Sequence, residues 1–440
     1  MIKMLEQLFS RFPKVLILGF GKEGRSTYNF IRKHFPKLQL AIADSNVDIA
    51  NDYVVANDLL LEVIVGDNYL SCLDNFDVVI KSPGVKVNNP PAEFVEKMTS
   101  QTDLFLRYYS SQTIGVTGTK GKSTTASLIK HFIDASKKTA LLLGNIGVPA
   151  FDMIDAIDDD TIIVYELSAH QLEYTQSSPH IAVLLNVFPE HLDYFDSYES
   201  YQNAKFNIFR YQNENDITIF HELFTEELYQ NCKEFVQNGK QVSQTLVTVS
   251  NNDYKIENKN NPLIGKHNLQ NINIALAAVQ KVGVNTDVAL NSLKNFVSLP
   301  HRLENIGEFA GIRFVNDSIS TIPQSAIAAV VALENVDTLI LGGYDRGLDY
   351  SGMVDFLIKS DISNFIFLGK AGDRIYDMFN LINKKKELIK ASSMENAFAI
   401  IKDVTEVGSI CLLSPAAASY DQFNNFEHRG DIFKILARKL

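Results

Sequence analysis

The sequence predicts an α/β protein built from three consecutive units. Short apolar runs typical of buried strands alternate with helical segments along the 440 residues, and this alternation indicates parallel sheets covered by helices. Two glycine-rich loops each follow such a run and precede a helical segment, as nucleotide-binding loops do. The length allows about two to four domains of roughly 100–200 residues each.

The three units are predicted from the order of strands and helices. The first is expected to have strands at residues 14–19, 38–44 and 77–82, and a helix at 25–35 that ends before Pro36. The second is expected to have a strand at 113–116, a helix at 123–134, and strands at 139–143, 161–167 and 181–187. Its polar segment 239–261 predicts exposed hairpins or loops. The third is expected to have strands at 311–315, 338–341, 364–368 and 409–413.

The composition is ordinary for a soluble protein, with 46% hydrophobic and 21% charged residues. The formal net charge of -11 argues against nucleic-acid binding, which usually needs a basic surface, but leaves small anionic ligands open. Cys72, Cys232 and Cys411 are far apart, so no disulfide framework or zinc site is predicted. We find no signal-peptide pattern and no apolar run of the roughly 18–20 residues a bilayer span needs, so we expect a cytoplasmic protein.

The segment 115–125 has the context of a triphosphate-binding loop, between a predicted strand and a predicted helix. Gly118 and Gly121 allow a tight turn whose N–H groups face phosphate oxygens, while Lys122 reaches the β- and γ-phosphates and the next hydroxyl can ligate magnesium. The fit to G-x-x-x-x-G-K-[ST] is imperfect, because Val116 occupies the position of the motif's first glycine. A glycine-rich turn without function is the alternative.

The segment Gly19-Phe20-Gly21-Lys22-Glu23-Gly24 is a complete G-x-G-x-x-G, and Asp44 follows about 20 residues later. This pattern suits NAD, but a pyrophosphate on a helix N-terminus with an acidic partner for a hydroxyl describes a UDP-sugar equally well. A tight turn that only lets helix and strand pack closely is the other alternative. Two nucleotide-type loops in one chain favour a ligase or transferase that acts on a nucleotide-linked substrate.

The phosphate loop, with its shifted first glycine, resembles that of the Mur ligase family. Further segments follow in the order the family carries them: Ser82-Pro83-Gly84, 144–147, 166–172, 186–193, Ala204-Lys205, 265–271, His301-Arg302 and Asn316-Asp317-Ser318. The resemblance covers nearly the whole chain. It implies a Rossmann-like UDP-binding domain (1–103), a central P-loop ATPase domain (104–299) and a Rossmann-like C-terminal domain (300–440) that binds glutamate.

The C-terminal segments 413–416, 419–423 and 426–430 are similar to those of the glutamate-adding branch of the family. The resemblance therefore implies an ATP-dependent ligase that adds glutamate to UDP-N-acetylmuramoyl-L-alanine through an acyl phosphate, in peptidoglycan precursor synthesis. The partners would be these small molecules, with no nucleic acid and no membrane span, and we expect a monomer. ATP and Mg²⁺ would be required, and Lys205 would be carbamylated.

The resemblance also implies which residues act. The catalytic set would be Lys122, Glu166, His191 and Lys205. ATP would contact Gly118, Thr119, Gly121, Lys122, Ser123, Thr124, His267, Asn268, Asn271, Arg302 and Asp317. Magnesium ligands would be Ser123, Thr124, Glu166, His191 and Lys205. The UDP-substrate would contact Gly19, Phe20, Gly21, Asp44, Ser45, Ser82, Pro83, Gly84, Asn145, Ser168 and Gln171. Glutamate would contact Thr321, Arg346, Ser414 and Phe423.

Two positions depart from the family pattern. Ile319 stands where many glutamate-adding relatives have lysine, and Arg346 stands where some have lysine. Both features resemble a subfamily that adds L-glutamate, so D-glutamate is favoured only as the commoner substrate. Two functions of other classes stay open at this point. An NAD-dependent dehydrogenase would use the first loop alone, and a regulatory P-loop ATPase would use the second alone.

Overall fold

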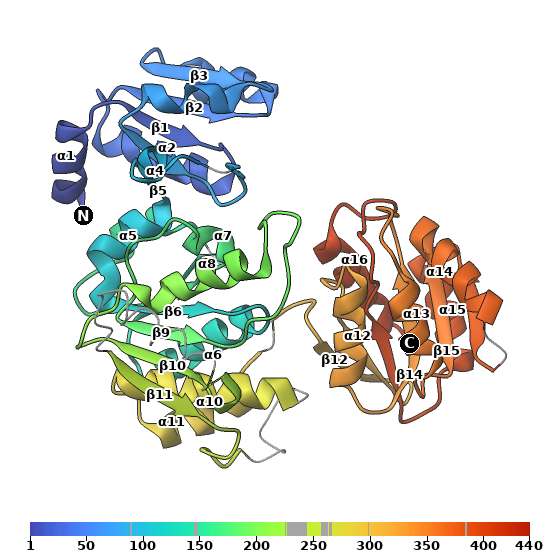
Figure 1. Cartoon of the computed structure of the whole chain (residues 1–440). Coiled ribbons are helices and arrows are strands. Elements are labelled where there is room, and N and C mark those ends of the chain that lie inside the picture. The colour runs from blue at the N-terminus through green and yellow to red at the C-terminus, as the bar shows by residue number, and fades with distance from the viewer. Residues whose placement is uncertain are drawn as a thin grey trace. The chain divides into compact units, whose positions relative to one another are not determined.

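The computed structural model describes residues 1–88, 90–144, 148–224, 226, 244–256, 263, 266–297, 299–382 and 385–440. The chain forms two compact units, the first from Met1–Ile256 with Gln270–Lys294 and the second from Glu257–Leu269 with Asn295–Leu440. Figure 1 shows the elements of both. Within the parts of the chain just given, no helix is both long and apolar enough to cross a bilayer.

The first sheet has five parallel strands in the order β3-β2-β1-β4-β5. Its strands are β1 (Val15–Leu18), β2 (Leu40–Asp44), β3 (Leu61–Val65), β4 (Val78–Lys81) and β5 (Met98–Thr99). The helices of this segment are α1 (Ile2–Arg11), α2 (Lys22–His34), α3 (Tyr53–Ala56), α4 (Ala92–Val95) and α5 (Gln101–Tyr109). Every residue of β1 is buried, as expected for a central strand covered on both faces.

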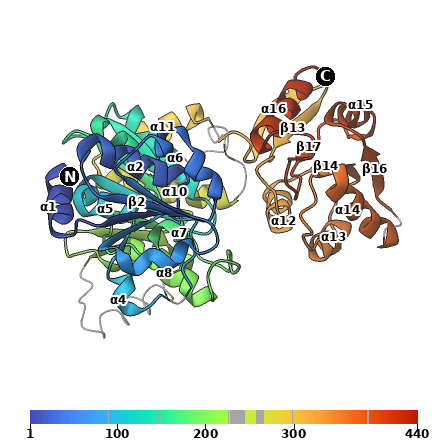
Figure 2. The same ribbon diagram turned by 90° about the horizontal axis from the view of Figure 1, so that it is seen from above.

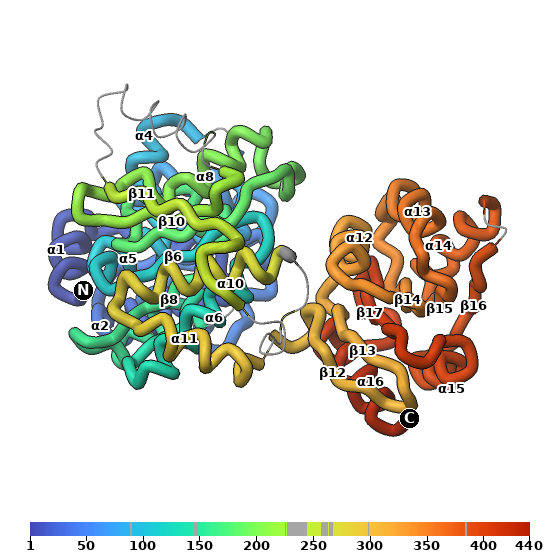
Figure 3. The backbone as a smooth tube through the Cα atoms, turned by 90° about the horizontal axis from the view of Figure 1, so that it is seen from below, coloured from blue at the N-terminus to red at the C-terminus, as the bar shows by residue number. Residues whose placement is uncertain are grey.

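The central sheet belongs to the same unit and has six parallel strands in the order β11-β10-β9-β6-β8-β7. Its strands are β6 (Thr113–Thr117), β7 (Ala140–Gly144), β8 (Ile162–Glu166), β9 (Ile181–Leu184), β10 (Ile217–His221) and β11 (Thr245–Val249). Its helices are α6 (Lys122–Ala135), α7 (Ala169–Leu172), α8 (Tyr198–Arg210), α10 (Lys266–Lys281) and α11 (Thr286–Ser292). Figure 3 shows α11 beside α6, in agreement with their contacts.

The third sheet lies in the second unit, in the order β12-β13-β17-β14-β15-β16, and only β12 is antiparallel to its neighbour. Its strands are β12 (Glu304–Phe309), β13 (Ile312–Asn316), β14 (Val336–Gly342), β15 (Asn364–Leu368), β16 (Glu387–Ala391) and β17 (Ile410–Leu413). Helices α12 (Pro323–Ala332), α13 (Ser351–Ile358) and α14 (Gly369–Ile382) cover one face, and α15 (Met394–Val404) and α16 (Phe426–Ala437) the other (Figure 2).

The predicted α/β class with parallel sheets is confirmed, but one segment was predicted wrongly. Residues 245–249, expected in a hairpin or loop, form β11, which pairs in parallel with β10. The strand lies at the sheet edge and only Val249 is buried, so the run lacks the continuous apolar character of an inner strand. Helix α2 begins at Lys22 rather than at residue 25, so its first turn lies inside the glycine loop.

Each predicted domain range contains one of the three sheets. The expected boundary after residue 103 falls within α5, whose Leu104, Phe105 and Leu106 are buried in one core cluster with residues of both neighbouring sheets. This shared core explains why the first two sheets form one compact unit. The domain boundaries themselves stay a prediction.

Candidate active site

The phosphate loop connects the end of β6 to the start of α6, at the carboxyl edge of the central sheet. Gly121 has φ 88°, a left-handed backbone that favours glycine, and a Cβ there would lie 2.6 Å from Oδ1 of Asn271. The Lys122 ammonium donates to the carbonyls of Gly118 at 2.9 Å and Thr119 at 3.0 Å. The loop thus holds a cation over its own backbone, next to the N-terminus of α6.

Ser123 and Glu166 meet beside this loop. The Ser123 hydroxyl donates to Oε1 of Glu166 at 3.1 Å, and Glu166 ends β8, the strand next to β6, with no exposed surface. No group of three His, Cys, Asp or Glu side chains suited to a metal occurs among the residues placed in the structure. A hydroxyl and one carboxylate nevertheless suit Mg²⁺, which commonly takes its other ligands from phosphates and water.

Lys205 reaches the same loop from α8. Its side chain is buried, and Nζ donates to the carbonyl of Gly118 at 2.8 Å and lies 4.7 Å from the ring centre of Tyr201. Burial, assisted by the charge of Lys122, holds the pKa of Lys205 well below its usual value. Two lysine amines therefore share one carbonyl, and burial disfavours the charged form of the more deeply buried one, Lys205.

His191 lies in the loop that follows β9. Its φ of 57° is left-handed, and its ring lies 5.0 Å from that of His170. Burial lowers the pKa of His191, although Glu190 opposes this shift. Glu190 accepts from Nζ of Lys120 at 2.5 Å. Sequence reasoning missed this ion pair, because nothing in the sequence brings residues so far apart together.

The first glycine loop opens onto a cavity of about 440 Å³ in the same unit. Nine predicted substrate residues line it: Gly19, Gly21, Asp44, Ser45, Ser82, Pro83, Gly84, Ser168 and Gln171. Phe20 does not, because its side chain is buried against Tyr28 while its N–H donates to Asp44 at 2.7 Å. Asn145 lies outside the described residues. Lys22, Glu23 and Tyr69 also line the cavity and were not predicted.

Close packing explains why this loop needs its glycines. A Cβ on Gly24 would lie 2.1 Å from the carbonyl oxygen of Gly19, so α2 can start directly against the end of β1 only with glycine there. Ser82 donates to that same carbonyl at 2.7 Å from the end of β4. The N-terminus of α2 and the carboxyl ends of β1, β2 and β4 therefore face one cavity, the usual ligand position of such sheets.

The predicted nucleotide residues outside the phosphate loop fall in both units. Asn268 and Asn271 are buried on α10, and Asn271 touches Gly121, whereas His267 is exposed. Arg302 and Asp317 belong to the second unit, as do His267 and Asn268 at the start of α10, whereas Asn271 belongs to the first. Asp317 is buried and accepts from the Ser414 hydroxyl at 2.8 Å and from the N–H of Leu303 at 3.2 Å.

Burial raises the pKa of Asp317 to about 6. Ser414, one of the residues predicted to bind the substrate glutamate, donates its hydroxyl hydrogen bond to this carboxyl group. Arg346 donates to the carbonyl of Thr321 at 2.8 Å. Phe423 packs partly buried, with its ring 5.8 Å from that of His428.

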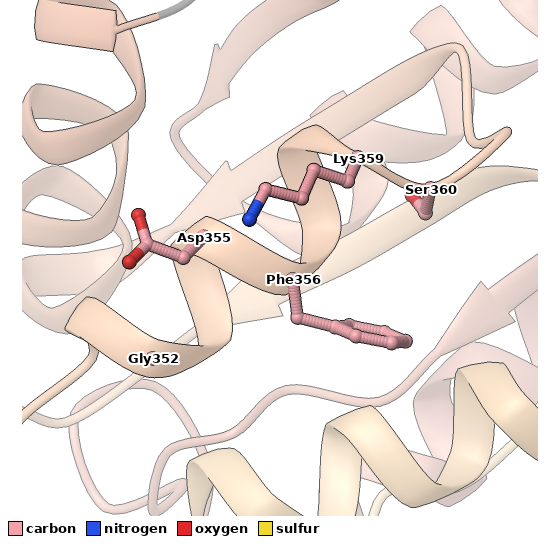
Figure 4. Close-up of a pocket in the computed structure, with 5 residues that line it drawn as sticks. All are labelled: Gly352, Asp355, Phe356, Lys359 and Ser360. Carbon is pink, nitrogen blue, oxygen red and sulfur yellow. The ribbon is translucent and has the colours of Figure 1, made fainter.

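A second hollow in the C-terminal unit is shallow and contains no predicted residue. It lies along α13 and the turn after it, and its lining residues are Gly352, Asp355, Phe356, Lys359 and Ser360. Figure 4 shows Phe356 pointing away from Asp355 and Lys359. One exposed helix face with no convergent polar groups is not a binding-site geometry.

Comparison with known proteins identifies the family. Residues 116–279 match the Mur ligase middle domain. A UDP-N-acetylmuramoylalanine–D-glutamate ligase of Clostridium botulinum (strain Langeland) is 31% identical, over 98% of this chain and 98% of its own. The chain belongs to the Mur ligase family. A protein of the same name from Alkaliphilus metalliredigens is 29% identical over 97% of this chain and 98% of its own.

Solved Mur ligases share the fold. The MurF ligase of Thermotoga maritima, in complex with ADP, has a TM-score of 0.55 at 16% identity, covering 84% of this chain and 92% of its own. MurC of Thermotoga maritima has a TM-score of 0.55 at 16% identity, covering 97% and 99%. Membership of a ligase family sets aside the dehydrogenase and regulatory-ATPase interpretations of the two glycine loops.

Proposed function

We propose that this Mur ligase joins D-glutamate to UDP-N-acetylmuramoyl-L-alanine and hydrolyses ATP to ADP and phosphate. One observation carries the proposal: a single compact unit contains two nucleotide-type sites. The first is the phosphate loop with Lys122 and Ser123, whose hydroxyl is bonded to Glu166. The second is the cavity at the first glycine loop. The names of the relatives supply the substrates.

The chemistry requires activation, because an amine does not displace oxide from a carboxylate. An oxygen of the alanyl carboxylate attacks the γ-phosphorus of ATP, the bond to the β-phosphate oxygen breaks, and ADP leaves. The glutamate amine then attacks the acyl carbon, phosphate leaves, and the amine proton passes to solvent or phosphate. Lys122, at the mouth of the loop, would offset the negative charge on the phosphoryl oxygens.

Magnesium would be held by Ser123 or Thr124 with Glu166, and a second ion by His191 with Lys205 as its carbamate. When bound, these ions would supply positive charge that binds and polarises the phosphates. The carbamate would form when the neutral amine of Lys205 attacks CO2, making an N–C bond and releasing one proton. The buried position and lowered pKa of Lys205 favour this reaction, because only the neutral amine is nucleophilic.

The remaining predicted residues would bind the three substrates. Thr119, Gly118 and Gly121 would hold the phosphates, while His267, Asn268, Asn271, Arg302 and Asp317 would hold the rest of the nucleotide. The lining of the 440 Å³ cavity would take the UDP-linked substrate, with Phe20 contributing structurally. Thr321, Arg346, Ser414 and Phe423 would position glutamate, with the Arg346 guanidinium suited to a carboxylate.

L-glutamate is the second candidate, because Ile319 and Arg346 depart from the pattern of D-glutamate ligases. The test is phosphate release with ATP, Mg²⁺ and UDP-N-acetylmuramoyl-L-alanine, with each glutamate isomer supplied separately. We expect release with D-glutamate. Release only with L-glutamate would reverse the stereochemistry and keep the ligase, whereas release with neither isomer would contradict the ligase activity.

A further inference from the structure

Glu23 occupies the first turn of α2 and lines the cavity of the first glycine loop. The side chain of Gln171, on α7, donates from Nε2 to Oε1 of Glu23 at 2.5 Å. From α5, Gln101 donates to the backbone carbonyl of Glu23 at 3.3 Å. Glu23 thus joins the glycine-loop helix α2 to α7, a helix of the central sheet, and to α5.

The orientation of the Gln171 amide is fixed by its other end. The N–H of Ser168 donates to Oε1 of Gln171 at 2.9 Å, and the Ser168 hydroxyl lies 3.1 Å from the same atom. A backbone N–H can only donate, so the amide oxygen must face Ser168 and the NH2 must face Glu23. One oxygen of Glu23 is therefore engaged as an acceptor.

The other oxygen of Glu23, Oε2, is buried and has no hydrogen-bond partner within the described residues. Ionisation would place negative charge on this buried atom, at a cavity whose helix N-terminus suits an anionic ligand. Charged groups near it do not remove this penalty. Burial raises the pKa of Glu23 to about 7. This effect is larger than the opposite effects of the Gln171 hydrogen bond and of the charges on Lys81 and Lys22, which lower the pKa.

We propose that Glu23 is a positioning residue of the substrate cavity and must hold a proton while the anionic UDP-linked ligand is bound. The neutral carboxyl keeps Gln171 and Ser168 in place along the cavity wall without repelling the pyrophosphate. An ionised Glu23 keeps the bond to Gln171 but adds a like charge beside the ligand. Binding above neutral pH therefore takes up one proton. This inference rests on the proposed function only for the identity of the ligand.

Within the described part of the chain, the titratable groups around Glu23 and its cavity come from four elements. Lys22 lies on the same helix, Lys81 ends β4, Tyr165 lies on β8, and Asp44 lines the cavity from β2. The charges of the two lysines favour the ionised form of Glu23 and therefore oppose its protonation. Burial raises the pKa of Tyr165 far above neutral pH, so this phenol stays uncharged.

The test is calorimetric binding of UDP-N-acetylmuramoyl-L-alanine, without ATP or glutamate, between about pH 5.5 and about pH 8.5. The carboxylate of the ligand, with a pKa of about 3.5, stays ionised throughout this range. For the wild type we expect a constant Kd below about pH 6 and a rise above about pH 7 that approaches tenfold per unit. Repeating the titration at about pH 7.5 in buffers of different ionisation enthalpy should show uptake of a large fraction of one proton.

Glu23→Gln keeps the shape and the acceptor for Gln171 and is permanently neutral. We expect it to bind the ligand at every pH as the wild type binds at low pH, with proton uptake near zero. Glu23→Ala should weaken binding about tenfold or more at all pH values, because it frees Gln171. Glu62→Gln, at an exposed position of β3, is the matched control and should behave as the wild type.

The outcomes separate the inference from the proposed function. Equal pH dependence and equal proton uptake in the wild type and Glu23→Gln would overturn the role of Glu23 while leaving the substrate assignment intact. Weaker binding by Glu23→Gln than by the wild type at high pH would likewise overturn this role, because such a result would show that binding needs the ionised form of Glu23. Absence of binding by the wild type and by Glu23→Gln at every pH would refute the proposed substrate, and this inference with it.

Discussion

The ammonium of Lys81, at the end of β4, lies 3.1 Å from Oε2 of Glu173, which directly follows α7. The Lys81 side chain is only 2% exposed, and burial lowers its pKa while Glu173 opposes the shift. Tyr194 donates to the same Oε2 at 2.8 Å and lies 2.9 Å from the ammonium. Lys81, Glu173 and Tyr194 therefore form one polar cluster, which joins the first sheet to the end of α7 and to the loop after β9.

Replacing Lys81 by Met should lower the stability of the first unit by about 2 kcal/mol, because Glu173 loses its charged partner in a largely buried place. The measurement is the thermal midpoint of unfolding. Lys86→Met is the matched control, since Lys86 pairs with Asp196 at the surface and such pairs contribute about 0–1 kcal/mol. Equal effects of the two changes would show that the Lys81 pair is no stronger than a surface pair.

Removal of CO2 should inactivate the wild type if Lys205 acts as a carbamate. We expect the ligase rate in CO2-depleted buffer to fall on the order of 10–100-fold and to return with bicarbonate. Lys205→Ala should be inactive with or without bicarbonate and should be partly rescued by a short-chain carboxylic acid. Full activity of the unrescued variant would refute the carbamate.

Replacing Arg346 by Met should raise the KM for glutamate roughly 10–100-fold, because a charge-assisted bond to a carboxylate is lost. The KM values for ATP and for the UDP-linked substrate should stay unchanged in steady-state kinetics. Arg313→Met, at an exposed position of β13, is the control. A uniform rise in all three KM values would point to a general distortion instead of glutamate binding.

Asp317→Asn should change the pH dependence of stability in the second unit. The pKa of Asp317 is raised in the folded chain, so its contribution is fully present below about pH 4 and is lost as pH rises through about 6. The wild type should therefore lose about 2 kcal/mol relative to the variant between those values, and about 3 kcal/mol in total by about pH 7. Urea unfolding across this range measures the difference, and a constant difference would mean that Asp317 titrates normally.

Arg429→Lys should destabilise the second unit by about 2–3 kcal/mol. The buried guanidinium of Arg429 donates to two atoms of Ser318, the hydroxyl oxygen at 3.0 Å and the backbone carbonyl at 2.8 Å. It also donates to the carbonyls of Ala417 and Ala418. Burial lowers its pKa to about 10, so it stays charged. An ammonium cannot match this planar fork. Thermal unfolding should show little change for the exposed control Arg438→Lys.

Much of the fold followed from local pattern, and the exceptions have physical causes. Inner strands such as β8 and β15 are continuous apolar runs between breakers, so their burial on both faces is visible in sequence. The strand β11 lacks this pattern: among the described residues it lies at the edge of its sheet, and only Val249 of its five residues is buried. The predicted phosphate loop does lie between a strand and a helix, β6 and α6, as its contiguous glycines, lysine and hydroxyl indicate.

The sequence by itself determined the α/β class, the two glycine loops and the family, since each depends on residues close together or in fixed order. Only the tertiary structure decided what faces those loops. The bonds of Glu23 to Gln171, of Lys205 to Gly118 and of Lys120 to Glu190 join segments that are distant in the chain. Burial and charge at such contacts depend on how strands and helices pack, and they raise the pKa of Glu23 and lower that of Lys205, which no local pattern encodes.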